Sequence, residues 1–247
     1  MHIRGRHSGA HGYVLGVKCM DRTSPVYLKN DVPESLKKAF RQSSYSFKIS
    51  KGKNIILQGD VQEDVYLLDE GRAEISIWAL DSSETIFREM RKGQIFGELA
   101  ALDSQPRSAS VTALDNCSLY RMSGGQFKEF LNSHAEFRDW FYQYLANRIR
   151  NLSEKVFELA QLNVGPRLWK EILRLAEENH TSSDTVVITN FPSQEKLAAR
   201  LGAGREAINR ELKFMVSQNT IEKLGRGRIK VNSLSNLNSM LDRIYNK

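Results

Sequence analysis

The chain has 247 residues, of which 40% are apolar, and its formal net charge is +7. This length fits one large domain or two modest ones with ordinary buried cores. The apolar runs are too short to span a bilayer, and the first residues lack the apolar segment of a signal peptide. The two cysteines, Cys19 and Cys117, are too few to predict a disulfide framework, and they cannot supply the four thiolates of an iron–sulfur cluster. We therefore expect a cytoplasmic protein with no membrane contact.

The positive charge is concentrated towards the C-terminus. Residues 165–247 contain 14 Lys or Arg and 9 Asp or Glu, a net charge of +5, whereas the first 164 residues contain 22 and 20. Such asymmetry is typical of a chain in which one end binds nucleic acid. A solvated basic surface would have the same composition, so the charge favours DNA only together with a binding motif.

The first predicted element follows a polar leader. Residues 1–24 contain His2, His7 and His11 without metal-ligand spacing, and we interpret this segment as a flexible leader. Between residues 27 and 45, apolar side chains recur at helical intervals, which predicts a short helix. These apolar side chains are Leu28, Val32, Leu36 and Phe40.

From Tyr45 to about Met122 the pattern changes to short alternating runs separated by glycine turns. The clearest predicted strands are residues 45–49, 65–68, 73–78 and 110–114. Closely spaced strands with glycine turns indicate an antiparallel roll or barrel. Gly59 and Gly71 suit tight turns in which φ must be positive. We expect a β-roll domain over residues 25–134.

One stretch inside this roll has the residues needed to bind a sugar phosphate. Gly97 allows the backbone to approach an anion, and the free N–H groups of the helix that follows point at phosphate oxygens. Arg107 can pair with the same phosphate through a two-pronged contact. Glu98 cannot favour a phosphate, which leaves a ribose hydroxyl as its natural donor. The stretch resembles the phosphate-binding cassette of cyclic-nucleotide-binding domains, which implies a 3′,5′-cyclic nucleotide.

Helical periodicity returns near Ser123 and includes a long helix from about residue 135 to 162. Its apolar positions follow an a/d heptad pattern: Leu145, Ile149, Leu152, Val156 and Leu159. This pattern favours a coiled-coil homodimer, and the alternative is an amphipathic helix packed on its own roll. We assign residues 135–164 to a dimerisation helix. Val164-Gly165-Pro166 should break it and form the hinge, because Pro166 cannot donate the helical hydrogen bond.

Residues 165–247 predict a winged helix-turn-helix domain. A helix beginning at Pro192 ends at Gly202, and a second helix begins near Arg205. Two helices joined by a tight glycine turn form a helix-turn-helix, whose second helix enters the DNA major groove. Two basic strands around residues 225–227 predict the wing, which suits phosphate contacts. The candidate DNA contacts are Ser193, Gln194, Arg205, Glu206, Asn209, Arg210, Lys213, Arg226 and Arg228.

The order of these parts resembles the cyclic AMP receptor protein (Crp–Fnr) family of bacterial transcription regulators over roughly residues 27–235. The matching motifs are Gly97-Glu98-Leu99, Arg107-Ser108-Ala109, Ser153-Glu154-Lys155-Val156 and Arg205-Glu206-Ala207-Ile208-Asn209-Arg210. The resemblance implies an α+β fold with an antiparallel β-roll, a dimerisation helix and a C-terminal winged helix-turn-helix. It also implies a homodimer that binds double-stranded DNA and RNA polymerase and has no enzymatic activity.

The resemblance assigns roles to the cassette residues. Glu98 would bind the ribose 2′-hydroxyl, and Arg107 and Ser108 would bind the cyclic phosphate. The backbone of the residues around Glu98 would lie close to the nucleotide; these residues are Gly97, Leu99 and Ala100.

The resemblance also bears on the base and the DNA site. Members of the family that bind cyclic AMP contact its base with a Thr-Ser pair on the dimerisation helix. This chain has Leu152-Ser153 at that position. Leu152 cannot make the hydroxyl contact to the adenine amino group. Cyclic AMP is the first expected ligand, and cyclic GMP, or both, is the alternative. The family's DNA motif implies a palindrome with TGTGA-like half-sites, although Gly204 stands where serine is common.

Other functions fit the sequence less well. A haem sensor of the same fold needs an axial ligand, and no histidine lies between His11 and His134. A kinase regulatory subunit or channel module needs a docking segment or membrane spans, and an enzyme needs a nucleophile–base spacing that this chain does not show. A constitutive DNA-binding dimer that senses no nucleotide is the remaining alternative.

Overall fold

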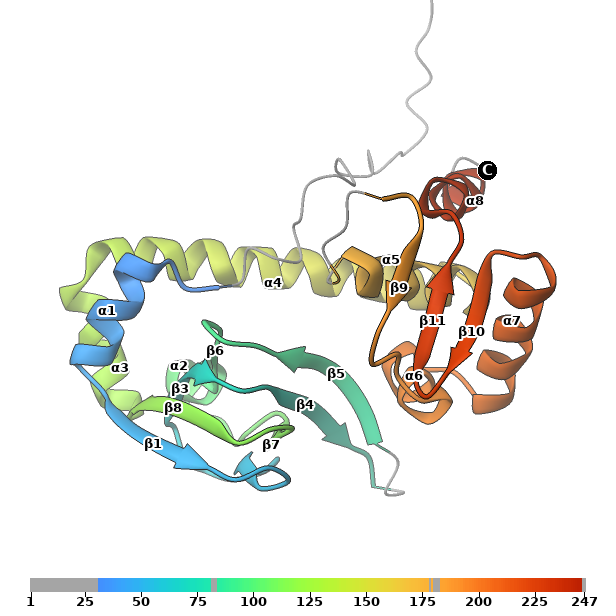
Figure 1. Ribbon diagram of the computed structural model, residues 1–247. Helices are drawn as coiled ribbons and strands as arrows, with labels where there is room; N and C mark the ends of the chain where they lie inside the picture. The colour runs from blue at the N-terminus through green and yellow to red at the C-terminus, as the bar shows by residue number, and fades with distance from the viewer. Residues whose placement is uncertain (1–30, 81–83, 178, 180–182, 246–247) are drawn as a thin grey trace, which may run out of the picture.

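The computed structural model describes residues 31–80, 84–177, 179 and 183–245. They form a β-roll, a long helix and a second unit of helices with a small sheet (Figure 1). The leader predicted over residues 1–24 and the start of the first predicted helix lie outside the described residues. Within the described part of the chain, no helix has both the length and the apolar character needed to cross a membrane.

The roll consists of two antiparallel sheets of four strands, ordered β1-β8-β3-β6 and β2-β7-β4-β5. The strands are β1 Tyr45–Ile49, β2 Asn54–Ile56, β3 Val65–Glu70, β4 Ala73–Trp78, β5 Glu84–Met90, β6 Ile95–Phe96, β7 Ser110–Ala113 and β8 Cys117–Met122. The predicted strands are confirmed to within two residues at each end. Gly59 and Gly71 both have a φ of +86°, which confirms the predicted turns.

Strand β3 shows how the roll builds two cores. Its first four residues are all buried. Successive strand residues point to opposite faces, so Tyr66 and Leu68 pack between the two sheets while Val65 and Leu67 pack beneath the helices. A strand covered on both faces therefore has a continuous apolar run in place of alternation.

Three helices cover the second of these cores: α1 Glu34–Gln42, α3 Gly124–Ser133 and the start of α4 Ala135–Gln161. They contribute a cluster of buried aromatic side chains, Phe40, Phe127, Phe130, Phe137 and Phe141. The rings of Phe130 and Phe137 meet edge to face with centroids 4.9 Å apart. Because each buried aromatic side chain contributes roughly 1.5–3 kcal/mol, this cluster anchors the first turns of α4 to the roll.

The break after the long helix lies two residues earlier than expected. Helix α4 ends at Gln161 and α5 Val164–Glu177 begins after Leu162 and Asn163. The prediction that Val164-Gly165-Pro166 would break the helix is therefore wrong in position, since these residues form the first turn of α5. Proline is accepted there because first-turn N–H groups have no partner within the helix.

The second unit has the winged arrangement predicted for it. After α5 come β9 Val186–Ile188, α6 Gln194–Leu201, α7 Arg205–Ser217, β10 Ile221–Gly225, β11 Arg228–Val231 and α8 Leu234–Tyr245. The sheet order is β10-β11-β9, all antiparallel. Gly202 ends α6 in the left-handed conformation, with a φ of +57°, so the predicted glycine turn is confirmed. Leu197, Leu201, Ile208 and Leu212 pack the two helices into one core.

The two units touch through α6 and the β4–β5 hairpin (Figure 1). Glu74 and Glu89 lie directly opposite one another on β4 and β5. Lys196 Nζ lies 3.3 Å from Glu74 Oε2, and Arg200 Nη2 lies 3.5 Å from Glu89 Oε2. Like charges opposite each other on a sheet are unfavourable, so the two cations of α6 offset this repulsion. We name this contact region the domain junction.

Candidate functional site

The chain reverses sharply between β6 and the short helix α2 Glu98–Asp103, at Gly97. Gly97 has a φ of +83° and immediately precedes the helix. A Cβ at this position would lie 2.7 Å from the Asp64 carbonyl oxygen and 3.0 Å from Arg107 Nη1. Only glycine therefore permits this close approach of backbone to guanidinium.

Arg107 lies next to this turn and is 5% exposed. Its Nη1 donates to the Gly97 carbonyl at 2.8 Å, and its Nη2 donates to the Asp64 carbonyl at 2.7 Å. In the described residues, no carboxylate forms an ion pair with it. Burial lowers the pKa of Arg107, although the nearby Tyr66 and Asp64 oppose this shift. A guanidinium has five N–H donors, so three remain for an anion at the start of α2.

Glu98 is almost fully buried and forms an ion pair with Arg148 of α4. Arg148 Nη1 also donates to the Tyr144 hydroxyl at 3.1 Å, and that hydroxyl donates to the Ile95 carbonyl at 3.2 Å. Burial opposes the charge on Arg148, but the proximity of Glu98 and Tyr144 outweighs it and raises the pKa of Arg148. The carboxylate predicted to meet a ribose is thus oriented by the long helix, and its lone pairs still allow a further donor.

Sequence reasoning did not find Arg148 or Tyr144. Their spacing of four residues places them on one face of α4, which is the available sequence signal. The pairing with Glu98 spans 50 residues along the chain and depends on how α4 packs against the roll.

The structure brings only some of the predicted ligand residues together. Gly97, Glu98 and Arg107 converge around the start of α2, where Ala100 is buried. Ser108 and Leu99 are exposed. In contrast, Ser153 on α4 donates to the Ile149 carbonyl of its own helix at 3.0 Å.

Leu152 lies next to Ser153 in an exposed apolar stripe on α4. The stripe residues are 47–66% exposed: Ile149, Leu152, Val156, Phe157 and Leu159. Apolar side chains on this face of the chain are available for a contact with another molecule.

The predicted DNA-contacting residues lie on the helix-turn-helix and the wing. Most of them are exposed: Ser193, Arg205, Glu206, Arg210, Lys213, Arg226 and Arg228. Gln194 and Asn209 are half-buried, and the Gln194 amide donates to the Asn209 side-chain oxygen at 3.2 Å, which ties α6 to α7. The Ser193 hydroxyl accepts from the Lys196 backbone N–H as the N-cap of α6. Arg205 forms a 3.0 Å surface ion pair with Glu195.

Comparison with known proteins agrees with both halves of this architecture. Residues 46–134 match the family model of the cyclic nucleotide-binding domain, and residues 166–240 match that of the Crp-like helix-turn-helix domain.

Relatives of known function are similar over most of the chain. A CRP-like cAMP-activated global transcriptional regulator of Mycobacterium tuberculosis is 26% identical over 66% of this chain and 73% of the relative. The cAMP-activated global transcriptional regulator CRP of Salmonella typhimurium is 27% identical over 76% of this chain and 90% of the relative. The solved structure of the c-di-GMP responsive global regulator CLP of Xanthomonas campestris has the same fold, with a TM-score of 0.69 and 18% identity. That alignment covers 81% of this chain and 100% of CLP.

These matches agree with the roll and with the glycine turn beside a buried arginine. They also agree with the exposed side chains of α7, the second helix of the helix-turn-helix. Relatives with this pair of domains are regulators of transcription and not enzymes. The chain therefore belongs to the Crp–Fnr family, as a cyclic-nucleotide-type regulator that binds DNA through its helix-turn-helix.

Proposed function

We propose that this regulator binds a purine cyclic mononucleotide in the cassette Gly97–Ser108, with cyclic AMP as the first candidate. The observation that supports this most strongly is Arg107, a buried cation held by two carbonyl oxygens. Carbonyl dipoles orient a guanidinium but leave its charge available to a phosphate. Arg107 and Ser108 would bind the cyclic phosphate, and Glu98 would accept from the ribose 2′-hydroxyl.

The base would lie towards α4, where Leu152 and Ser153 follow Arg148 by about one turn. The relatives from Mycobacterium tuberculosis and Salmonella typhimurium are cAMP-activated, which favours cyclic AMP. Leu152 has no hydroxyl for the adenine amino group, so cyclic GMP is the second candidate. Calorimetric titration of each nucleotide separately decides between them. Binding of cyclic AMP at least as tight as that of cyclic GMP supports the proposal, and binding of neither would refute it.

We further propose a homodimer formed through α4. Within its exposed stripe, Ile149, Leu152, Val156 and Leu159 follow the heptad spacing of a coiled coil, and pairing two copies would remove these side chains from water. Under this proposal the chain divides into a roll over residues 25–134, a dimerisation segment over 135–164 that contains α4, and a DNA-binding domain over 165–247. The chain would act in the cytoplasm on a palindrome with TGTGA-like half-sites, together with RNA polymerase.

A charge on the stripe tests the dimer. Val156→Glu should raise the dimer dissociation constant by about 100-fold, because two carboxylates would have to be buried at the seam. Gln143→Glu is the matched control, since Gln143 is exposed on the opposite face of the same helix. Sedimentation analysis measures both variants. A Val156→Glu protein that dimerises as well as Gln143→Glu would exclude this seam.

In the dimer, the ligand would act by linking the roll to the long helix. Glu98 and Arg148 already connect α2 with α4, and α4 leads through Leu162 and Asn163 to the DNA-binding unit. A nucleotide bound at Glu98 would favour one arrangement of these elements, to the extent that it binds that arrangement more tightly. The coupling free energy in such systems is typically about 1–3 kcal/mol.

A further inference from the structure

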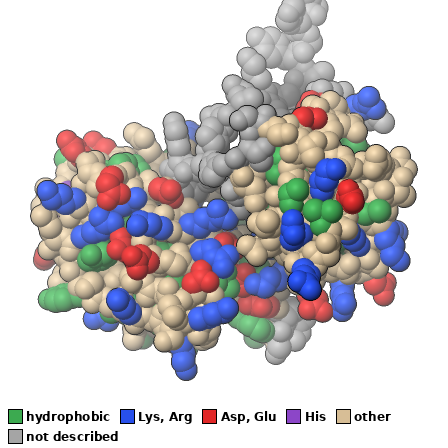
Figure 2. All heavy atoms as spheres, viewed as in Figure 1, with side chains coloured by type: hydrophobic (Ala, Val, Ile, Leu, Met, Phe, Trp, Pro, Cys, Tyr) green, Lys and Arg blue, Asp and Glu red, His purple; other side chains and the backbone are tan. Residues whose placement is uncertain are grey.

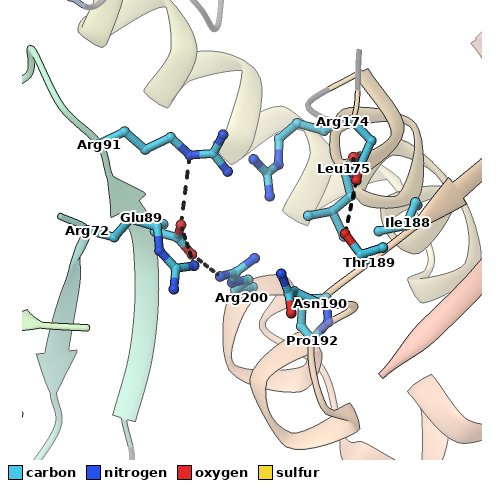
Figure 3. Close-up of a pocket in the computed structure, with 11 residues that line it drawn as sticks. Arg72, Glu89, Arg91, Arg174, Leu175, Ile188, Thr189, Asn190, Pro192 and Arg200 are labelled. Carbon is cyan, nitrogen blue, oxygen red and sulfur yellow. Dashed lines mark hydrogen bonds and ion pairs between the residues drawn. The ribbon is translucent and has the colours of Figure 1, made fainter. Parts of the chain in front are cut away.

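A cavity of about 190 Å³ lies at the domain junction. The roll contributes Arg72, which precedes β4, and Arg91, which follows β5, while the second unit contributes Arg174 of α5 and Arg200 of α6. Figure 3 shows the four guanidinium groups extending towards the same space from both sides. Lys and Arg side chains also gather near this boundary in the space-filling view (Figure 2). We call Arg72, Arg91, Arg174 and Arg200 the arginine cluster.

Carboxylates behind the cavity hold the arginine cluster in place. Glu171 accepts from Arg174 Nε at 2.8 Å and from Arg200 Nη1 at 3.2 Å. Asp115 accepts from Arg72 Nε at 2.8 Å. Although burial opposes the charge on Glu171, the hydrogen bonds from Arg174 and the nearby Arg200 hold the pKa of this carboxyl below its usual value. The guanidinium groups of Arg72, Arg174 and Arg200 are therefore oriented before any ligand arrives.

The cavity itself has more cations than anions. Among the described residues that line it, Glu89 is the carboxylate, and it forms ion pairs with Arg72, Arg91 and Arg200. The buried Nε of Arg200 has no hydrogen-bond partner in the described structure. Thr189, Asn190 and Asn179 supply further polar groups on the opposite wall.

We propose that this cavity binds a small phosphate-bearing anion of about the size of inorganic pyrophosphate. Guanidinium forks match the geometry of phosphate oxygens and bind them through two parallel hydrogen bonds. The proposed site shares no residue with the cassette Gly97–Ser108, so it goes beyond the proposed function.

Occupancy of this site would affect the arrangement of the two units. Because the cations come from both the roll and the DNA-binding unit, a bound anion favours the arrangement in which they face each other. Any change in DNA affinity that the anion causes must be matched by an equal change in anion affinity when DNA binds.

Four variants of the full chain test the proposal by calorimetry with sodium pyrophosphate at constant ionic strength. Wild-type protein should bind saturably, and Arg91→Gln should weaken binding by about tenfold through loss of a charged donor. Arg91 suits the test because its side chain is 46% exposed and lies at the edge of the cavity, 3.8 Å from Glu89. Glu89→Gln should tighten binding, since it removes the carboxylate that competes with the anion. Arg138→Gln on α4 removes the same charge outside the cavity and should bind as wild type does.

Three results would overturn the proposal. The first is the absence of saturable binding to the wild-type chain, and the second is equal affinity in Arg91→Gln and Arg138→Gln. Arg107→Gln separates this site from the cassette, because it should lose the cyclic nucleotide and keep pyrophosphate. Loss of pyrophosphate in Arg107→Gln would place the anion in the cassette, which overturns this proposal and leaves the proposed function standing.

Discussion

Arg107 in the roll and Arg200 at the domain junction are both nearly buried guanidinium groups, but their partners differ. Arg107 donates to two backbone carbonyls, whereas Arg200 contacts the carboxylates of Glu89 and Glu171. Carbonyl dipoles orient a cation without neutralising it, while carboxylates neutralise it and tie together the elements that bear them. The roll thus keeps one cation available for a ligand, and the junction uses most of its cationic charge to hold two units together.

The largest expected effect is on ligand binding by Arg107. Arg107→Gln should weaken cyclic nucleotide binding by about 1,000-fold, because two charge-assisted hydrogen bonds to phosphate are lost. Calorimetry on the variant and on Arg138→Gln as the charge-matched control measures this effect. Wild-type affinity in Arg107→Gln would show that its charge has no part in ligand recognition.

For the free energy of unfolding, we expect the loss of Arg200 to have a larger effect than the loss of Arg107. Arg200→Gln deprives Glu89 and Glu171 of a shared cation and should lower the free energy of unfolding by about 2 kcal/mol, since partly buried ion pairs are costly to break from one side. Arg107→Gln should cost less, about 1 kcal/mol, because it breaks hydrogen bonds to two carbonyls but leaves no carboxylate without its cation. Urea denaturation of both variants compares them. A larger loss in Arg107→Gln would reverse the assigned roles.

The backbone that holds Arg107 can be tested with a pair of glycines. Gly97→Ala forces a side chain into the left-handed region and towards the Asp64 carbonyl, so it should cost roughly 1–3 kcal/mol and weaken nucleotide binding. Gly125→Ala is the control, because a Cβ there meets open space near the start of α3, and it should be neutral or slightly stabilising. Thermal unfolding measures both. Equal stability of the two variants would show that the turn at Gly97 is not required.

The smallest expected effect is on the acid stability of the junction. The pKa of Glu171 in the folded chain lies below the value of 4.5 for a free carboxyl, so the folded state binds fewer protons than the unfolded state in that range. The contribution of Glu171 to stability is therefore full above pH 4.5 and is lost as the pH falls through its lowered pKa. Glu171→Gln should flatten the acid limb of the unfolding free energy against pH. An unchanged acid limb would contradict the ion pairs described at Glu171.

Local patterns in the sequence predicted much of the fold. The alternation of apolar and polar residues predicted both ends of β1 and of β4 correctly. Gly202 predicted the position of the turn between α6 and α7. These features depend on residues close together in the sequence, so they can be predicted without knowledge of the tertiary structure. Helix α8 was not predicted, although its Leu237 and Leu241 are buried against the second unit.

The chemistry of the sites was less accessible from the sequence. Gly97, Glu98 and Arg107 lie within one short stretch and could be predicted together. The partner of Glu98 could not, because Arg148 approaches it only after α4 packs on the aromatic core. The arginine cluster is harder still, since Arg72 and Arg200 belong to different units and meet only across the domain junction.

The proposed function requires that a ligand bound at Arg107 changes the affinity of α7 for DNA. The most direct measurement is the affinity for a TGTGA-type palindrome with and without saturating cyclic AMP or cyclic GMP, in wild-type protein and Arg107→Gln. We expect one nucleotide to change the wild-type DNA affinity by about 5- to 150-fold and to leave the DNA affinity of Arg107→Gln unchanged. Equal wild-type affinity in the absence and presence of both nucleotides would contradict it and describe a constitutive DNA-binding protein.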